Sequence, residues 1–291
     1  MHFGTLLAAI ASYLQARASG GRWLLRIEDI DPPREQPGAA DVIVAALASY
    51  GFQWDGDVVY QSRSTARHRE AAAYLVDSGL AYRCGCSRQD LASVRQGPLG
   101  PIYPGTCRAA TESKRTSLRV RTDNEPIEFH DLLQGPQSQR LEGESGDFVI
   151  KRRDGLVAYH LAVVVDDFEQ GVTQVVRGID LLDSTPRHIH LQRLLGYATP
   201  EYAHIPVALN ASGQKLSKTT GAAPIPRDRP GPVLVAALRA LEQSPPEALA
   251  FGSVAEIWQW AIEHWTLDTL LQRRCIDQPA NPMAESGNPL S

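Results

Sequence analysis

Apolar residues recur at helical spacing from the very start of the chain. Leu6, Leu7, Ile10, Tyr13 and Leu14 fall on one face of a predicted helix, which the run Ser19-Gly20-Gly21 ends. Similar periodic segments, bounded by capping residues, glycine or proline, predict three more helices. These cover residues 39–50, 65–77 and 185–195.

Short apolar or alternating runs between these helices predict β-strands over residues 22–27, 116–122, 147–152, 173–176 and 205–209, with a strand end at Tyr60. Strands that alternate with helices in this way favour an α/β fold with a doubly wound, parallel sheet of the Rossmann type. After a proline-rich stretch, residues 233–241, 254–264 and 267–274 predict a small C-terminal helical appendage. The tail from Asp277 is rich in Pro, Asn and Ser and is predicted to be disordered.

The composition is that of an ordinary globular protein, with 43% hydrophobic and 21% charged residues among 291. A net charge of −4 gives no overall signal for nucleic acid, so an RNA contact would need a local basic patch such as residues 108–121 or 151–153. No apolar run approaches the roughly 18 residues of a membrane span, and no Lys or Arg precedes the first helix as in a signal peptide. We therefore expect a cytoplasmic protein without membrane contact, and four cysteines fit a reduced compartment.

His2 and Gly4 stand at the predicted N-terminus of the first helix. Free N–H groups and the helix dipole favour a phosphate there, an imidazole can donate a hydrogen bond, and glycine allows close approach. Lys215 and Lys218 lie in a loop after the last predicted strand, where two lysines can close on a triphosphate as it reacts. Taken singly, a surface histidine and an exposed basic turn are the simpler interpretations.

Polar side chains at the C-terminal ends of strands lie where ligands usually bind in such a sheet. Glu28 follows the first predicted strand and could hold an ammonium group. Arg177 ends another strand, and its fork can pair bidentately with a carboxylate, to which Tyr159 could add a hydroxyl. A structural salt bridge and a core aromatic remain the alternatives for Arg177 and Tyr159. Ungrouped histidines are interpreted as ordinary polar surface or core residues: His188, His190 and His204.

Three cysteines, Cys84, Cys86 and Cys107, fall within 24 residues among turn-forming residues. Zn²⁺ prefers thiolates in tetrahedral geometry, so these cysteines indicate a zinc site. A short helix is predicted directly after Cys86. Free or reactive thiols are the alternative. The residues alone leave the fourth ligand open between Cys275, a histidine, a carboxylate and water.

Several separated segments resemble the glutamyl branch of the class I aminoacyl-tRNA synthetases. Residues 2–5 (HFGT) resemble the HIGH signature of that family, and residues 215–219 (KLSKT) resemble its KMSKS loop. Between them, residues 25–34, 159–167 and 177–180 resemble further glutamyl-branch segments, in the family's order. The resemblance covers residues 1 to about 225.

The resemblance implies an enzyme that activates L-glutamate with ATP, accompanied by Mg²⁺, and transfers the acyl group to RNA. It implies ATP binding by His2, Gly4 and Lys218, with Lys215 as a further catalytic residue. It also implies glutamate binding by Glu28, Tyr159 and Arg177.

The chain is too short for the anticodon-binding domain of a full synthetase, so it is most similar to the shortened glutamyl-Q subgroup. That subgroup transfers glutamate to the queuosine base at the wobble position of tRNA(Asp). Its structural zinc is held by a C-x-C pair, a tyrosine and a cysteine, which match Cys84, Cys86, Tyr103 and Cys107. The alternatives are a truncated relative that charges a tRNA 3′ end, and a catalytically dead RNA- or nucleotide-binding relative.

These expectations divide the chain into catalytic segments over 1–83 and 151–222, a zinc-containing insertion over 84–150, the appendage over 223–276 and the tail over 277–291. A monomer is the default. The family has a further strand and loop of the form R-F-A-P-S-P-T-G before the HIGH motif, which this sequence lacks. Either the start lies upstream, which we favour, or the protein is a degraded relative. Without that strand, its neighbours would be left with unpaired backbone groups.

Overall fold

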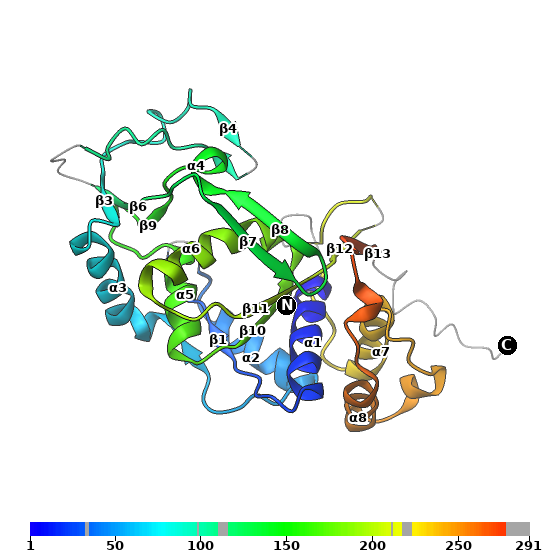
Figure 1. Cartoon of the computed structure of the whole chain (residues 1–291). Coiled ribbons are helices and arrows are strands. Elements are labelled where there is room, and N and C mark those ends of the chain that lie inside the picture. Colours follow the sequence, from blue (N-terminus) through cyan, green and yellow to red (C-terminus); the bar gives the residue numbers. More distant parts are fainter. Residues whose placement is uncertain (33–34, 98, 110–115, 211, 217–222, 278–291) are drawn as a thin grey trace.

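The computed structural model describes residues 1–32, 35–97, 99–109, 116–210, 212–216 and 223–277 (Figure 1). Its first helix, α1 (Phe3–Ala18), starts at the N-cap residue His2 and buries the predicted face, including Leu6, Ile10 and Leu14. Gly20 follows the helix with φ +66°, a left-handed conformation that glycine adopts without strain. The prediction for this segment is confirmed.

Parallel strand pairs and intervening helices form the body of the molecule, which confirms the α/β class. Strand β1 (Arg26–Ile27) pairs with β2 (Val59–Tyr60), and β10 (Gln174–Gly178) pairs with β11 (Glu201–Ile205), both parallel. The helices that connect or flank these strands are α2 (Ala39–Ser49), α3 (Thr65–Asp77), α5 (Tyr159–Glu169) and α6 (Thr185–Leu195), with 3-10 turns at η1 (Gln61–Ser64) and η2 (Ile179–Ser184).

The parallel strands do not form one continuous sheet. Within the described residues, β1 pairs only with β2, and β10 pairs only with β11, so each has an edge without a partner strand. This agrees with the expectation of unpaired edges. The predicted strand over 22–27 shrinks to Arg26–Ile27 in the ladder. Its first part instead contacts the loop before β2, where the Asp55 N–H donates to the Trp23 carbonyl, and only from Leu25, whose carbonyl accepts from the Val59 N–H, does the chain reach β2.

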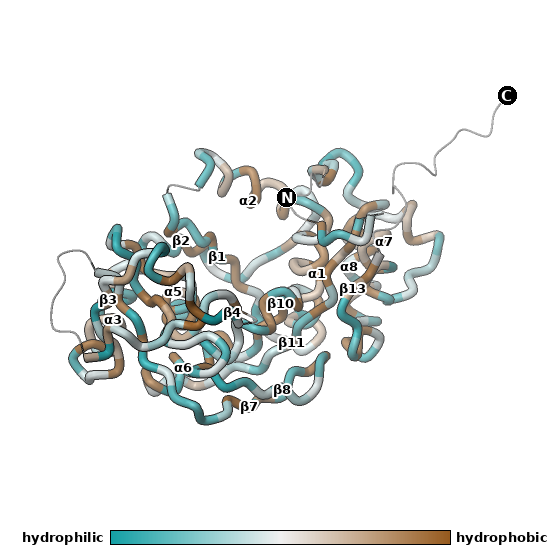
Figure 2. Tube along the Cα trace, turned by 90° about the horizontal axis from the view of Figure 1, so that it is seen from above, coloured by the Kyte–Doolittle hydropathy of each residue, from teal (hydrophilic) through white to brown (hydrophobic). Residues whose placement is uncertain are grey.

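A β-hairpin was not predicted from the sequence. It consists of β7 (Pro126–Asp131) and β8 (Gly135–Arg140), and β7 joins the parallel pair through β11. The hairpin escaped prediction because β8 has the sequence GPQSQR and offers no apolar alternation. Seen from above, it is mostly hydrophilic, whereas β1, β10 and α5 are largely hydrophobic (Figure 2).

The insertion is built on a three-stranded antiparallel sheet of β3 (Ala81–Cys84), β6 (Ser117–Val120) and β9 (Val149–Lys151). A short ribbon of β4 (Gln96–Gly97) and β5 (Gly100–Pro101), with α4 (Leu141–Glu144), completes it. The predicted short helix after Cys86 is wrong, because this segment forms only turns with i to i+3 hydrogen bonds.

The C-terminal helices α7 (Pro230–Ala240) and α8 (Val254–His264), with η4 (Glu247–Phe251) between them, share one hydrophobic core with α1. The helix predicted over 267–274 is wrong. A short turn, η5 (Asp268–Leu270), is followed by β13 (Cys275–Asp277), which pairs with β12 (Val207–Leu209). Gln272 has φ +58° and donates its N–H to the Leu133 carbonyl, which ends any helix there.

No helix in the described ranges combines the length and the apolar character needed to cross a lipid bilayer. The tail predicted to be disordered falls, from residue 278 onward, outside the described residues.

Candidate active site

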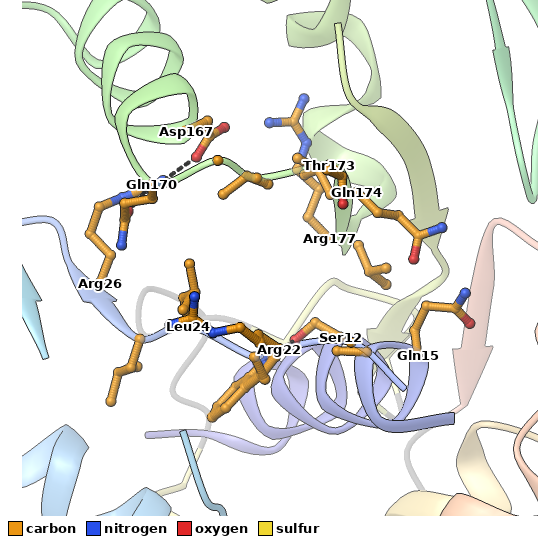
Figure 3. Close-up of a pocket in the computed structure, with 18 of the residues that line it drawn as sticks. Ser12, Gln15, Arg22, Leu24, Arg26, Asp167, Gln170, Thr173, Gln174 and Arg177 are labelled. Carbon is orange, nitrogen blue, oxygen red and sulfur yellow. Dashed lines mark hydrogen bonds and ion pairs between the residues drawn. The ribbon is translucent and has the colours of Figure 1, made fainter. Parts of the chain in front are cut away.

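A cavity of about 690 Å³ lies between the facing edges of β1 and β10, with the C-terminal half of α1 along one side (Figure 3). Ser12 and Gln15 face it from α1, and Leu24 and Arg26 from the segment around β1. Its size falls within the range of about 300–1,000 Å³ that is typical of small-molecule sites. The cavity occupies the place where the parallel sheet is interrupted.

The structure brings Glu28, Tyr159 and Arg177 together on the wall of this cavity. They come from the end of β1, the first turn of α5 and the end of β10. Desolvation raises the pKa of Glu28; Arg26 opposes this effect and Asp167 adds to it. Desolvation likewise raises the pKa of Tyr159, so its hydroxyl stays protonated and can donate a hydrogen bond.

Three charged residues at this wall were not predicted as site residues: Arg22, Arg26 and Asp167. Arg26 donates to Asp167 at 2.7 Å and to Gln170 at 2.6 Å, and lies 3.5 Å from Glu28. Desolvation raises the pKa of Asp167, against the opposing effect of Arg26. Asp167 was visible only as part of the segment 159–167, where nothing in the sequence distinguishes a cavity wall from a helix surface.

The guanidinium of Arg177 is largely committed to protein acceptors. Its Nε donates to His204 Nε2 at 3.0 Å, one N–H of Nη1 faces His188 Nδ1 at 3.2 Å, and Nη2 contacts Thr185 Oγ1 at 2.8 Å and the Leu181 carbonyl at 3.3 Å. Counting contacts with the described residues, four of its five N–H groups are therefore engaged, and one on Nη1 remains.

This arrangement differs from two expectations. In this structure Arg177 cannot present its fork bidentately, because the acceptors around it already occupy both ends of the fork. His188 and His204 are core residues, but they contact Arg177 directly. His190 is a core residue that hydrogen-bonds the Arg121 carbonyl.

The two signature-like motifs lie side by side. A Cβ added at Gly4 would stand 3.4 Å from the His2 ring and 3.7 Å from the Leu216 carbonyl, so the helix start and the lysine loop are in contact range. The His2 ring accepts a hydrogen bond from the Thr5 N–H, and the Met1 carbonyl accepts one from Ile225. The N-terminus of α1 is thus held against the segments that flank the loop.

Lys215 Nζ forms an ion pair with Asp180 Oδ2 at 2.5 Å. Asp180 follows Arg177 closely in the chain, so this contact links the lysine loop to the end of β10. Lys218, to which the resemblance assigns ATP binding, lies outside the described residues.

The sulfur atoms of Cys84, Cys86 and Cys107 lie within 4.8 Å of one another. The Tyr103 hydroxyl is 3.4 Å from Cys84 Sγ and 3.7 Å from Cys86 Sγ, and Cys86 and Cys107 Sγ are 3.5 Å apart. A Zn–S bond of about 2.3 Å implies a tetrahedron edge of about 3.8 Å, so this donor set fits the ion. Cys275 lies in β13 and is absent from the cluster, which removes it as a fourth ligand.

Arg119 is a neighbour of this cluster that was not singled out as one. Its Nε donates to Cys84 Sγ at 3.3 Å, and its guanidinium lies 4.0 Å from the centre of the Tyr103 ring. Burial raises the pKa of Cys84, but the hydrogen bonds with Tyr103 and Arg119 outweigh it and bring that pKa to about 7. Cys84 is therefore suited to present a thiolate, whereas burial and the neighbouring thiols raise the pKa of Cys86 to about 11.

Comparison with known proteins matches residues 1–225 to the family described as tRNA synthetases class I (E and Q), catalytic domain. The chain belongs to this family. It is a family of ligases, and the class I synthetase fold with its parallel strands is the one described above. The match spans both motifs, the cavity and the insertion.

Curated relatives extend the similarity over nearly the whole chain. It is 51% identical over 285 residues to the glutamyl-Q tRNA(Asp) synthetase of Dechloromonas aromatica (strain RCB), covering 96% of this chain and 95% of the relative. It is 52% identical over 266 residues to the enzyme of the same name from Ectopseudomonas mendocina (strain ymp), covering 91% and 89%.

A solved structure supports the fold assignment. The glutamate tRNA ligase from Elizabethkingia meningosepticum CCUG26117, in complex with its amino acid, superposes with a TM-score of 0.80 at 22% identity. The alignment covers 97% of this chain, which spans 65% of the length of that protein.

Proposed function

We propose that this class I synthetase activates L-glutamate with ATP in the absence of tRNA, and then transfers glutamate to the queuosine base at the wobble position of tRNA(Asp). The observation that carries the proposal is the cavity wall, where Glu28, Tyr159 and Arg177 meet within one recess, while the two motifs adjoin each other at the N-terminus of α1. The names of the relatives support the choice of RNA. The reaction would take place in the cytoplasm, on a monomer.

In the first step the α-carboxylate of glutamate attacks the α-phosphorus of ATP, and the bond to the leaving pyrophosphate breaks, which leaves glutamyl-adenylate. Glu28 and Asp167 offer carboxylates for the substrate ammonium group, because both line the cavity. Tyr159 donates its hydroxyl, and Arg177 supplies positive charge to a carboxylate. A hydroxyl of the queuosine base then takes the acyl group and releases AMP.

ATP is assigned to the N-terminus of α1. The helix dipole and free N–H groups favour its phosphates there, next to His2 and Gly4, with Lys215 and Lys218 on the adjoining loop. Mg²⁺ is expected with ATP because it usually bridges triphosphate oxygens and neutralises the charge that develops on them.

Zinc is assigned to Cys84, Cys86, Tyr103 and Cys107, whose spacing fits a tetrahedron. With four protein ligands such a site has no open position, so its contribution is structural. It would fix the loop of the insertion against the sheet of β3, β6 and β9.

The first test is glutamate-dependent exchange of pyrophosphate into ATP without tRNA. The 291-residue chain is assayed beside a form extended upstream through any in-frame R-F-A-P-S-P-T-G-like segment, since the sheet is interrupted between β1 and β10. Exchange by either form supports glutamate activation. If both forms are folded and neither exchanges, the proposed activity is wrong and a binding role takes its place.

The second test concerns the RNA. Radiolabelled glutamate is offered with tRNA(Asp) isolated with and without queuosine. Transfer only to the queuosine-containing tRNA supports the proposal, whereas equal charging of both indicates a synthetase that acts on a 3′ end.

A further inference from the structure

A buried polar chain runs from Arg177 into the core. The His204 ring stands between Arg177 and Asp131: its Nε2 faces Arg177 Nε at 3.0 Å, and its Nδ1 faces Asp131 Oδ2 at 2.5 Å. Both His204 and Asp131 have no exposed side-chain surface. The chain links the end of β10 to β11 and the end of β7.

The hydrogen-bond partners of His204 fix its tautomer. Arg177 Nε–H can only donate, so His204 Nε2 must carry a lone pair. The remaining ring proton is then on Nδ1 and is donated to the Asp131 carboxylate. The Thr185 hydroxyl, 3.2 Å from Nε2, is compatible with this assignment because it can also donate.

The second oxygen of Asp131 is held just as firmly. Its Oδ1 accepts hydrogen bonds from the backbone N–H groups of Leu133, Gln134 and His204 at 2.9–3.2 Å. The β7–β8 turn therefore fixes the carboxylate, the carboxylate fixes the imidazole, and the imidazole fixes the guanidinium.

We propose that Asp131 and His204 are positioning residues for Arg177, and that they fix the guanidinium so that its remaining Nη1 N–H serves the substrate carboxylate. This rests on the proposed function, in which Arg177 binds glutamate. Asp131 and His204 do not line the cavity, so any effect they have on glutamate is transmitted through Arg177.

The decisive variant is Asp131→Asn. The amide oxygen can keep the backbone hydrogen bonds, while the amide NH₂ donates to His204 Nδ1 and forces the ring proton onto Nε2. Two donors, the N–H groups of His204 Nε2 and Arg177 Nε, then face each other, and the hydrogen bond between them is lost. We expect the KM for glutamate in the exchange assay to rise at least about tenfold, while the KM for ATP changes less than about twofold.

Asp166→Asn is the matched control. Asp166 forms a comparable buried pair with His68 at 2.7 Å, also accepts from Gln61, and does not contact Arg177. If Asp131→Asn leaves the glutamate KM unchanged, or raises both KM values in the same proportion as Asp166→Asn, the positioning role is wrong.

Two substitutions at His204 distinguish the loss of the hydrogen bond to Arg177 from a general loss of folding. His204→Gln places an amide oxygen where Nε2 accepts, whereas His204→Leu has similar bulk and no acceptor. We expect His204→Gln to keep the glutamate KM within about threefold of the unsubstituted protein, and His204→Leu to resemble Asp131→Asn. Equal effects of the two would overturn the proposal.

A spectroscopic measurement tests the position of the His204 ring proton independently of whether the protein activates glutamate. Long-range ¹H–¹⁵N correlation spectra of the unsubstituted protein, with His204→Gln used for assignment, should show His204 protonated at Nδ1. Asp131→Asn should move the proton to Nε2. Failure of exchange in the unsubstituted protein counts against glutamate activation, whereas a proton on Nε2 in that protein counts against the positioning chain.

Discussion

Replacing Asp147 with asparagine should destabilise the insertion far more than removing the other acidic partner of the same arginine. Arg108 donates to Asp147 through Nε at 2.7 Å and through Nη2 at 2.6 Å, and to Glu142 at 3.1 Å. Asp147 has no exposed side-chain surface, whereas 44% of Glu142 is exposed. The pair therefore compares a buried with an exposed ion pair around one guanidinium.

The magnitudes follow from burial. Asp147 also accepts from Thr122 N–H at 2.8 Å and from the Tyr82 hydroxyl, so Asp147→Asn disturbs several hydrogen bonds at once. Breaking a fully buried pair costs about 3–5 kcal/mol, and the partial exposure of Arg108 reduces this to about 2–4 kcal/mol. Glu142→Gln should cost at most about 1 kcal/mol, as is usual for exposed pairs.

The measurement is the free energy of unfolding in urea, together with hydrogen exchange of the amides in β3, β6 and β9. Hydrogen exchange is measured as well because the insertion can open locally while the rest of the chain stays folded, and unfolding in urea would not report such an opening. A cost for Asp147→Asn that lies within about 0.5 kcal/mol of that for Glu142→Gln would refute the reasoning, since burial would then not decide the strength of the pair.

Further predictions concern the cavity, the thiol cluster and pH. Glu28→Gln should raise the KM for glutamate at least about tenfold in the pyrophosphate-exchange assay and leave the KM for ATP nearly unchanged. The reason is that only the ammonium group of glutamate loses a charged partner. An equal rise in both KM values would contradict this assignment. The protein purified without chelator should contain one zinc per chain by elemental analysis. Cys107→Ser should lose it and Cys275→Ser should keep it; retention by Cys107→Ser would count against the assigned ligands. For Asp147, burial raises the pKa, but Arg108 and other donors outweigh it and hold the pKa below its usual value. Its stabilising contribution is therefore complete above the unfolded pKa of about 3.9 and is lost as the pH falls through the folded value. The difference in unfolding free energy between the unsubstituted protein and Asp147→Asn should shrink between pH 5 and 3, and a constant difference would contradict the argument.

The sequence predicts what local periodicity and capping determine. Helix α1, with the stop after Ala18, and helix α6, with its proline start and Gly196 at the end, follow the spacing of their apolar residues. The spacing of Cys84, Cys86 and Cys107 among turn formers also indicates the thiol cluster, although it leaves the fourth ligand open.

Features that depend on partners far away in the chain cannot be predicted from local sequence patterns. Strand β8 exists because β7 pairs with it, and β13 exists because β12 offers an edge, although neither sequence has an apolar pattern of its own. The acceptors around Arg177 come from η2, α6 and β11, so no short segment reveals that four of its N–H groups are already used. Long-range packing, rather than propensity, sets these parts of the site.

The pairing of β13 with β12 has a consequence for the order in which the protein matures. Residues 207–209 lead directly into the lysine loop, and Leu216 N–H returns to the Ala208 carbonyl. A nascent chain folds from its N-terminus as it is made, but α1, which forms one side of the cavity, packs in one core with α7 and α8 and so needs residues from the end of the chain. The ladder that steadies the base of the lysine loop must await residue 277. Both the cavity and the base of the lysine loop are therefore expected to reach their final form only after residues 230–277 have been made.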